Sequence, residues 1–417
     1  MPFPPDLLIC DPHFHIWDNS VVKNKNLGGI ADGPLCTYLA SHYCASAAPL
    51  PLSSAVHVET VVGQDGSFDI DTVAETRFVL SETAGRDGPF GGKPVGICAF
   101  VDLGKPGAAH VIGAHFAAAG ARFVGVRMIM NYSATDSTLT WPQVASDAYI
   151  GHPPGSPAAN EHLPSNLALL GRLGLVFDFH ANWFQLAGGA ATLAALGDGA
   201  PVTVLDHLGC PKLGTGDARE DAVRVAAWKA GMRALAALPR VHVKISGLEY
   251  IRKGWMAQGS EARAQVAELV LWVVRTFGAA RCMVASNFPV DLHMGGEVRG
   301  AAGGAGRKGG RRGVGRLFFF TRRTFLTRAR PHNAPLSHAP QGLSALYASL
   351  FDLLAPLRAP GESDGVDAMR LLFHDVAERV YGLRRMQALA AGASVMDSPV
   401  GDALAVHLQQ QRAPSWW

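Results

Sequence analysis

The stretch "FVGVRMIM" at residues 123–130 is mostly apolar and contains a single charged residue, Arg127. The runs "LVFDF" at 175–179 and "PVTVL" at 201–205 have the same character. A strand with one face in water alternates apolar and polar residues, whereas a strand covered on both faces is apolar almost throughout. The three stretches therefore predict strands of a parallel sheet whose two faces are both buried.

Similar apolar runs recur along the chain and alternate with helical patterns. The expected strands cover residues 7–16, 54–61, 95–102, 123–130, 175–181, 202–207, 241–246 and 282–287. Helices are expected at 71–84, 220–238, 260–278, 343–357 and 368–383, where apolar residues recur at three- and four-residue steps. Such alternation is typical of βα units, and eight of them predict an α/β protein with a (β/α)8 or TIM barrel. A doubly wound open sheet is the alternative, although no glycine fingerprint follows the first strand.

Two segments interrupt the βα pattern. Residues 131–165 are turn-rich and predict a long loop after strand four. Residues 297–341 hold ten Lys or Arg and one acid, so the rest of this chain of net charge +3 carries −6. Their Gly- and Arg-rich composition predicts a disordered insertion after strand eight. We expect one barrel domain over 1–383, interrupted by 297–341, and a C-terminal tail at 384–417.

The basic insertion admits other interpretations. Its stretch "RLFFFTRRTF" interleaves aromatic and basic residues, which is also a feature of nucleic-acid-binding segments. Composition alone predicts binding only loosely, so we expect no nucleic-acid partner. Translated noncoding sequence is the remaining interpretation.

The overall composition is that of an ordinary globular protein. Of the 417 residues, 48% are hydrophobic and 17% are charged. The six cysteines form no C-x-x-C pair and predict reduced thiols rather than a disulfide framework. No apolar run reaches membrane-spanning length, and the N-terminal residues lack a basic signal-peptide region. We therefore expect a cytoplasmic protein with no membrane partner.

The first expected strand carries an unusual pair of histidines. In "DPHFHIWD" at 11–18, strand alternation places Asp11, His13 and His15 on one face. Imidazole rings need hydrogen-bond partners and are poor core filler, but they are good metal ligands and proton carriers. An ordinary pair of hydrogen-bonded histidines is the alternative.

Polar residues also occur at the ends of the other expected strands. They are His57 and Glu59 on one face of strand two, Arg127 in strand four, His180 in strand five, Asp206 and His207 in strand six, Lys244 and Ser246 in strand seven, and Asn287 followed by Asp291 after strand eight. In a (β/α)8 barrel the active site lies at the carboxyl ends of the strands. These side chains therefore predict one convergent site for a small-molecule substrate.

The residue types indicate two kinds of chemistry. The imidazoles of His13, His15, His180 and His207 could hold one divalent metal with an open position for water. A metal-free mechanism would instead use a His or Asp as general base. Arg127 and Lys244 suit the binding of a carboxylate, anionic or hydroxyl-rich substrate. Glu59 is expected to bind the substrate as well.

The ordered motifs resemble one known family. "DPHFHIWD", "FVGVRM", "LVFDFHANWFQL", "VTVLDHLGCP", "VHVKISGL" and "RCMVASNFPVD" are similar to the amidohydrolase-related (amidohydrolase 2) branch of the amidohydrolase superfamily. The resemblance covers residues 7–291 and resumes at 343–383. It implies a TIM-barrel hydrolase that opens a lactone of a small sugar acid or carboxylic acid. A metal-dependent decarboxylase and a catalytically impaired binding barrel are the alternatives.

The resemblance also assigns roles to individual positions. It implies that His13, His15, His180 and His207 bind a metal, with zinc the expected ion, although lactonases of this branch differ in whether they need one. Many relatives have Ser-Asp-Trp-Pro after strand eight, where this chain has Ser286, Asn287, Phe288 and Pro289. An amide cannot act as a base, so Asp291 is expected to replace that carboxylate. The expected catalytic set is thus His180, His207, Asn287 and Asp291; the sequence predicts no oligomeric state.

Overall fold

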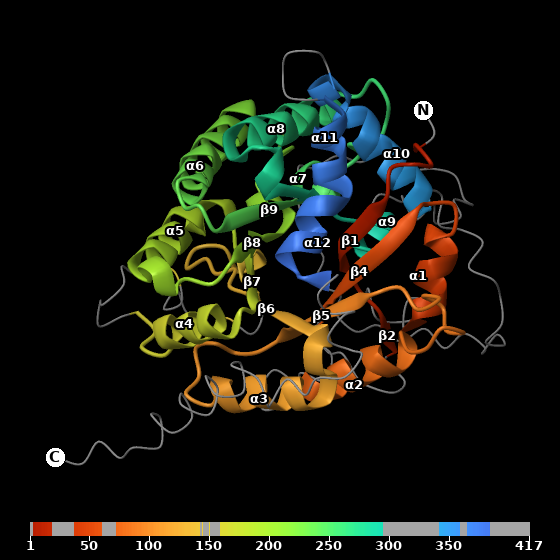
Figure 1. Ribbon diagram of the computed structural model, residues 1–417. Coiled ribbons are helices and arrows are strands. Elements are labelled where there is room, and N and C mark those ends of the chain that lie inside the picture. Colours follow the sequence, from red (N-terminus) through yellow and green to blue (C-terminus); the bar gives the residue numbers. More distant parts are fainter. Residues whose placement is uncertain are drawn as a thin grey trace, which may run out of the picture.

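The computed structural model describes residues 3–18, 37–60, 72–141, 144, 150, 159–294, 342–358 and 365–383. Eight parallel strands form one sheet in the order β1-β4-β5-β6-β7-β8-β9-β10, with helices outside it (Figure 1). The strands follow one another in sequence order, without the reversal of a doubly wound sheet. The predicted (β/α)8 barrel is therefore confirmed.

All eight expected barrel strands are present, some of them shorter than predicted. They are β1 (Ile9–Phe14), β4 (Leu52–Val58), β5 (Val95–Phe100), β6 (Phe123–Ile129), β7 (Val176–His180), β8 (Thr203–Leu205), β9 (Val241–Ile245) and β10 (Cys282–Val284). The short strands β2 (Trp17–Asp18) and β3 (Thr37–Tyr38) pair separately in an antiparallel ribbon.

The expected helices are also present in the described residues. They are α2 (Thr72–Glu82), α6 (Ala218–Ala236), α8 (Glu261–Phe277), α10 (Leu343–Leu353), and the pair α11 (Gly365–Arg370) and α12 (Val376–Val380), which are joined by a π-helical turn at Leu371–Asp375. The sequence analysis missed α1 (Ala40–Ala47), α3 (Ala108–Ala119), α4 (Leu163–Leu173) and α5 (Leu186–Ala195). Helices such as α5, "LAGGAATLAA", consist mainly of Ala and Gly, so they show little apolar and polar contrast.

The barrel closes at a seam between β1 and the end of β10. The backbone N–H of His15 donates to the carbonyl of Phe288 at 2.7 Å, and the N–H of Asn287 donates to the carbonyl of His13 at 2.8 Å. The Asp11 carboxylate accepts from the N–H and the hydroxyl of Ser286, at 3.0 and 2.6 Å. The seam therefore brings Asn287 beside the two histidines of β1.

The expected alternation along β1 is wrong at Asp11. The Asp11 carboxylate also accepts from the hydroxyl of Tyr43 on α1, at 2.8 Å, so it faces the outer helices. Cys10 packs in the barrel interior, and a register irregularity between Asp11 and Phe14 then turns His13 inward. Alternation requires regular pairing, and an irregularity of this kind re-aims the side chains that follow it.

The amino end of the barrel is filled by small apolar side chains and covered by the C-terminal helices (Figure 1). This interior cluster includes Cys10, Val56, Cys98, Val176, Val204 and Met283, packed against Val376, Ala377, Tyr381 and Leu383. A Cβ at Gly96 would lie 2.9 Å from both Leu383 Cδ2 and Val124 Cγ2. Position 96 therefore needs glycine for the C-terminal segment to approach this closely.

Several predictions concern residues outside the described ones. These are the insertion at 297–341, the tail at 384–417, Cys36 and residues 142–143, 145–149 and 151–158 of the loop predicted at 131–165. The other five cysteines are unpaired, as predicted. In the described part of the chain, no helix is both long and apolar enough to cross a membrane.

Candidate active site

The four histidines expected to cluster do lie together. The Nε2 atoms of His13 and His15 are 3.1 Å apart. The ring of His207 lies 4.7 Å from that of His13 and 5.1 Å from that of His180, between centroids. The carboxyl ends of β1, β7 and β8 thus bring imidazoles to one place, as the geometry of a barrel allows.

One nitrogen of most of these rings already has a partner. Nδ1 of His15 lies 2.7 Å from the carbonyl of Val58, and Nδ1 of His207 lies 2.9 Å from the hydroxyl of Ser246. A carbonyl only accepts, so His15 donates through Nδ1 and its Nε2 has a free lone pair in the neutral ring. Partners of this kind orient the histidine ligands of metals.

Burial keeps the imidazoles neutral. It lowers the pKa of His15 to about 3 and that of His180 to about 4. Burial also holds the pKa values of His13 and His207 well below the usual range. Neutral rings expose lone pairs, so the cluster is suited to bind a cation or to accept a proton.

The ring of His180 has weaker hydrogen-bond partners than the other three rings. Its Nε2 lies 3.5 Å from Cys210 Sγ, a long contact to a weak partner. Its Nδ1 is buried and has no hydrogen-bond partner among the described residues. An orphaned buried nitrogen at the carboxyl end of a barrel strand marks a place where a ligand can bind.

A layer of buried charges lies beneath the histidines. Lys244 on β9 forms an ion pair with Asp178 on β7, and its Nζ lies 3.1 Å from Asp206 Oδ1. The same Nζ is 3.3 Å from Nδ1 of His13. Burial alone would raise the pKa of Asp206, but the charge of Lys244 and the contact with His13 outweigh it and hold that pKa well below its usual range.

Arg127 completes this layer. It forms an ion pair with Glu59, and its guanidinium lies 3.8 Å from Asp206 Oδ2. Burial raises the pKa of Asp178 to about 6, so this carboxyl is ionised at neutral pH. The carboxylates of Glu59, Asp178 and Asp206 then face the two cations Lys244 and Arg127. This charged layer therefore carries one excess negative charge.

His57 does not join the site with Glu59, contrary to the expectation that they share a face. The His57 ring packs against Phe14 at 5.6 Å, and its Nε2 lies 3.8 Å from Glu75 on α2. The strand β4 ends at Val58, so alternation no longer governs Glu59, which turns toward Arg127 instead.

The turn after β10 places Asp291 next to the cluster, as the sequence analysis expected. Asn287 has a left-handed φ of 49°, and Val290 N–H donates to its carbonyl at 2.8 Å as α9 (Val290–Met294) begins. The Asn287 amide nitrogen donates to Asp291 Oδ1 at 2.8 Å. The side-chain oxygen Oδ1 of Asn287 lies 3.2 Å from Nε2 of His15. Asn287 therefore bridges the carboxyl and the histidines.

Asp291 has the character of an acid–base group. Its Oδ2 accepts from the backbone N–H of Gly247 at 3.0 Å. Burial raises its pKa to about 7 despite the hydrogen bonds that favour the ionised form. A carboxyl that titrates near neutral pH can both take and return a proton during a reaction.

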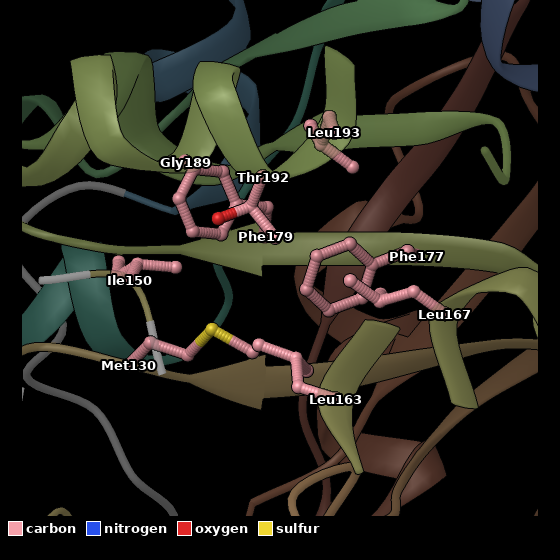
Figure 2. A pocket seen from close by; sticks show the side chains of 9 residues that line it. All are labelled: Met130, Ile150, Leu163, Leu167, Phe177, Phe179, Gly189, Thr192 and Leu193. Atoms are coloured by element: carbon pink, nitrogen blue, oxygen red, sulfur yellow. The ribbon is translucent and has the colours of Figure 1, made fainter. Parts of the chain in front are cut away.

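The sequence analysis did not single out Asp178, although a signal was present. In "LVFDFH" it is a charge within an apolar run, two residues before His180 and so on the same face of β7. The alternate residues, Phe177 and Phe179, line an apolar pocket on the other side of the strand, with Leu163 and Leu167 of α4 (Figure 2). The strand thus separates an apolar outer layer from a charged interior.

The family model for amidohydrolases matches residues 10–302 of the chain. The chain therefore belongs to the amidohydrolase family, and it is an enzyme of the hydrolase class that the motifs predicted. Among curated proteins, it is similar to "Uncharacterized protein y4mH" of Sinorhizobium fredii, with 28% identity over 298 residues, covering 69% of this chain and 86% of that protein.

Solved structures share the barrel fold. An amidohydrolase from Burkholderia multivorans with bound HEPES has a TM-score of 0.58 and 21% identity, and one with bound zinc has 0.58 and 19%. A probable 2-pyrone-4,6-dicarboxylic acid hydrolase from Acinetobacter baumannii, with bound citric acid, has 0.52 and 11%. Each comparison covers 90% of this chain and 99% of the other.

Proposed function

We propose that this hydrolase opens a lactone, a cyclic ester of a small sugar acid or carboxylic acid, by adding water. The observation that carries the proposal is the chain Asp291–Asn287–His15, which links a carboxyl of pKa about 7 to the histidine cluster. The Acinetobacter structure supports the choice of substrate, since a 2-pyrone is itself a cyclic ester.

The cluster fits a bound cation, and two features of this chain support that. Nε2 of His15 and Oδ1 of Asn287 are 3.2 Å apart, and both present lone pairs when Asn287 donates to an ionised Asp291. Two acceptors at this distance are unfavourable unless a cation or a proton lies near them. The charged layer beneath the histidines has an excess negative charge, which also requires a positive charge nearby because it is buried.

We propose that His13, His15, His180 and His207 hold this cation and that it is zinc. Donor atoms of His13, His207 and Asp206 lie within 4.8 Å of one another, so a carboxylate is available beside the imidazoles. All three residues are buried. Imidazole and carboxylate donors suit zinc. When bound, zinc would lower the pKa of a water and polarise a carbonyl.

The protein residues account for the proton transfers. Ionised Asp291 accepts a proton as the water oxygen adds to the lactone carbonyl carbon. The ring C–O bond then breaks, and protonated Asp291 returns the proton to the departing alkoxide, which yields the hydroxy acid. Asn287 keeps Asp291 in place through its 2.8 Å hydrogen bond.

The buried cations offset most of the carboxylate charge in this layer, which would otherwise oppose the negative charge that develops on the carbonyl oxygen. Arg127 and Lys244 are fully enclosed, so their field is weakly screened. Each is held by carboxylates and cannot move to meet the substrate, which keeps this field preorganised. Glu59 thereby acts through Arg127, whose guanidinium it fixes.

The test is a pH-indicator assay of the purified full chain, with and without added zinc, on a panel of sugar lactones and dicarboxylate lactones. Turnover that Asp291→Asn slows by at least about a hundredfold and Asp375→Asn retains supports the proposal. Asp375 is a suitable control because it bonds Arg370 and His374 on the C-terminal segment, at the other end of the barrel. Absence of turnover by folded protein on the whole panel, or release of carbon dioxide from a carboxylated substrate, would contradict it.

A further inference from the structure

The C-terminal segment contributes a side chain to the charged layer. Tyr381 follows α12 and is buried at the amino end of the barrel. Its hydroxyl donates to Asp178 Oδ1 at 2.6 Å, and Nζ of Lys244 lies 5.4 Å from the centre of its ring. Tyr381 thus contacts both members of a buried ion pair, although it lies beyond residue 302, where the family match ends.

Lys244 is held at the centre of this arrangement by three groups. Its ammonium contacts Asp178 as an ion pair, Asp206 Oδ1 at 3.1 Å and Nδ1 of His13 at 3.3 Å. A lysine ammonium has three hydrogens on a flexible stem, so its position depends on the balance among its acceptors. One carboxylate oxygen of Asp178 accepts from Tyr381 and the other from Lys244.

Removing the Tyr381 hydroxyl would alter that balance. Asp178 would lose a short hydrogen bond in a site without solvent, and its charge would then act more strongly on Lys244. The ammonium would move toward Asp178 and away from Asp206 and His13. Since His13 faces His15 at 3.1 Å, such a shift changes the geometry of the histidine cluster.

We propose that Tyr381 is a positioning residue for the active centre, acting through Asp178 on Lys244 and His13. The inference rests on the proposed function, which places Lys244 and His13 in the catalytic machinery. It implies that the C-terminal segment, besides covering the barrel, determines the arrangement of the catalytic groups.

The first test compares Tyr381→Phe with Tyr43→Phe. Both substitutions remove a buried tyrosine hydroxyl that donates to an aspartate, Asp178 at 2.6 Å or Asp11 at 2.8 Å. Tyr381→Phe is expected to lower kcat/KM by about ten- to a hundredfold, the usual effect of losing a supporting contact. Tyr43→Phe is expected to lower Tm similarly but to change kcat/KM less than about threefold. Equal kcat/KM for wild type and Tyr381→Phe would overturn the proposal.

A double-mutant cycle provides the second test. In a Lys244→Met background, Tyr381→Phe should cause no further loss of kcat/KM, because the residue through which it acts is gone. The Tm shifts of Tyr381→Phe and Lys244→Met should likewise be non-additive, whereas those of Tyr43→Phe and Lys244→Met should add. Additive effects in both assays would overturn the proposal.

The Tm cycle does not require any enzymatic activity. If no lactone is turned over, the proposed function fails, while non-additive Tm shifts still support the Tyr381–Asp178–Lys244 network. If Tyr381→Phe does not fold, Asp178→Asn replaces it in both cycles, since the amide removes the charge that holds Lys244.

Discussion

Replacing Lys244 by methionine tests the charged layer most directly. Methionine keeps most of the volume but removes the cation, which leaves Asp206 with Arg127 at 3.8 Å as its remaining cationic partner in this layer. At an effective dielectric constant of about 20, a pair of unit charges 3.1 Å apart interacts by about 5 kcal/mol. Breaking a buried pair typically costs about 3–5 kcal/mol. We therefore expect a large loss of unfolding free energy at pH 7.

The penalty that an unpaired Asp206 imposes on the folded variant has an upper limit that depends on pH. Asp206 can escape the unpaired charge by binding a proton, at a cost of about 1.36 kcal/mol for each pH unit above its ordinary pKa of 3.8. The limit for this carboxyl is about 4 kcal/mol at pH 7 and about 1.6 kcal/mol at pH 5. Without Lys244 the folded-state pKa of Asp206 is raised, so the variant loses stability as the pH rises between these values.

The assay is urea unfolding of metal-free protein at pH 5 and pH 7, for wild type and Lys244→Met. The matched control is Lys229→Met, which removes a surface ion pair in which Lys229 Nζ lies 3.7 Å from Oε1 of the exposed Glu268. This substitution should cost less than about 1 kcal/mol at either pH. A destabilisation by Lys244→Met that is the same at both pH values, or no larger than that of the control, would refute the reasoning.

Three further predictions concern the catalytic carboxyl, the cation and the C-terminal packing. In wild type, kcat/KM should rise through pH of about 7 as Asp291 loses its proton, and Asp291→Asn should be about 10²- to 10⁴-fold slower without this rise, in a pH-rate profile. In calorimetric titrations of chelator-treated protein, zinc should bind His15→Gln at least about tenfold more weakly than wild type. The control His110→Gln, which alters an exposed ring, should bind zinc as tightly as wild type. Gly96→Ala should cost about 1–3 kcal/mol in unfolding free energy, because its Cβ meets Leu383 and Val124, whereas Gly107→Ala, with open space around it, should be nearly neutral.

The barrel was predictable because its signals are local. Runs such as "FVGVRMIM" identify buried strands, and the order of the motifs assigns most of the polar strand ends to one rim. Asp291 was also expected as the carboxyl that replaces the missing aspartate. The turn that brings it back to Asn287 is a finding of the structure.

What the sequence could not predict depends on irregular backbone. Strand alternation placed Asp11 with His13 and His57 with Glu59, but a register irregularity in β1 and the end of β4 separate each pair. The helices α3 and α5 escaped prediction since alanine and glycine provide little periodic contrast. Such features are decided by tertiary packing, which a single sequence does not display.

The role of Tyr381 illustrates the same limit at the level of the site. Nothing in "AERVYGL" marks the tyrosine as functional, because its partner Asp178 is 203 residues away and inside the barrel. Only the closed barrel brings His13 of β1, Lys244 of β9 and Tyr381, which follows α12, into one network. A reaction that uses His13 would therefore depend on both ends of the described chain, and a protein ending at residue 302 would lack the hydroxyl that holds Asp178 as well as the apolar side chains that cover the barrel.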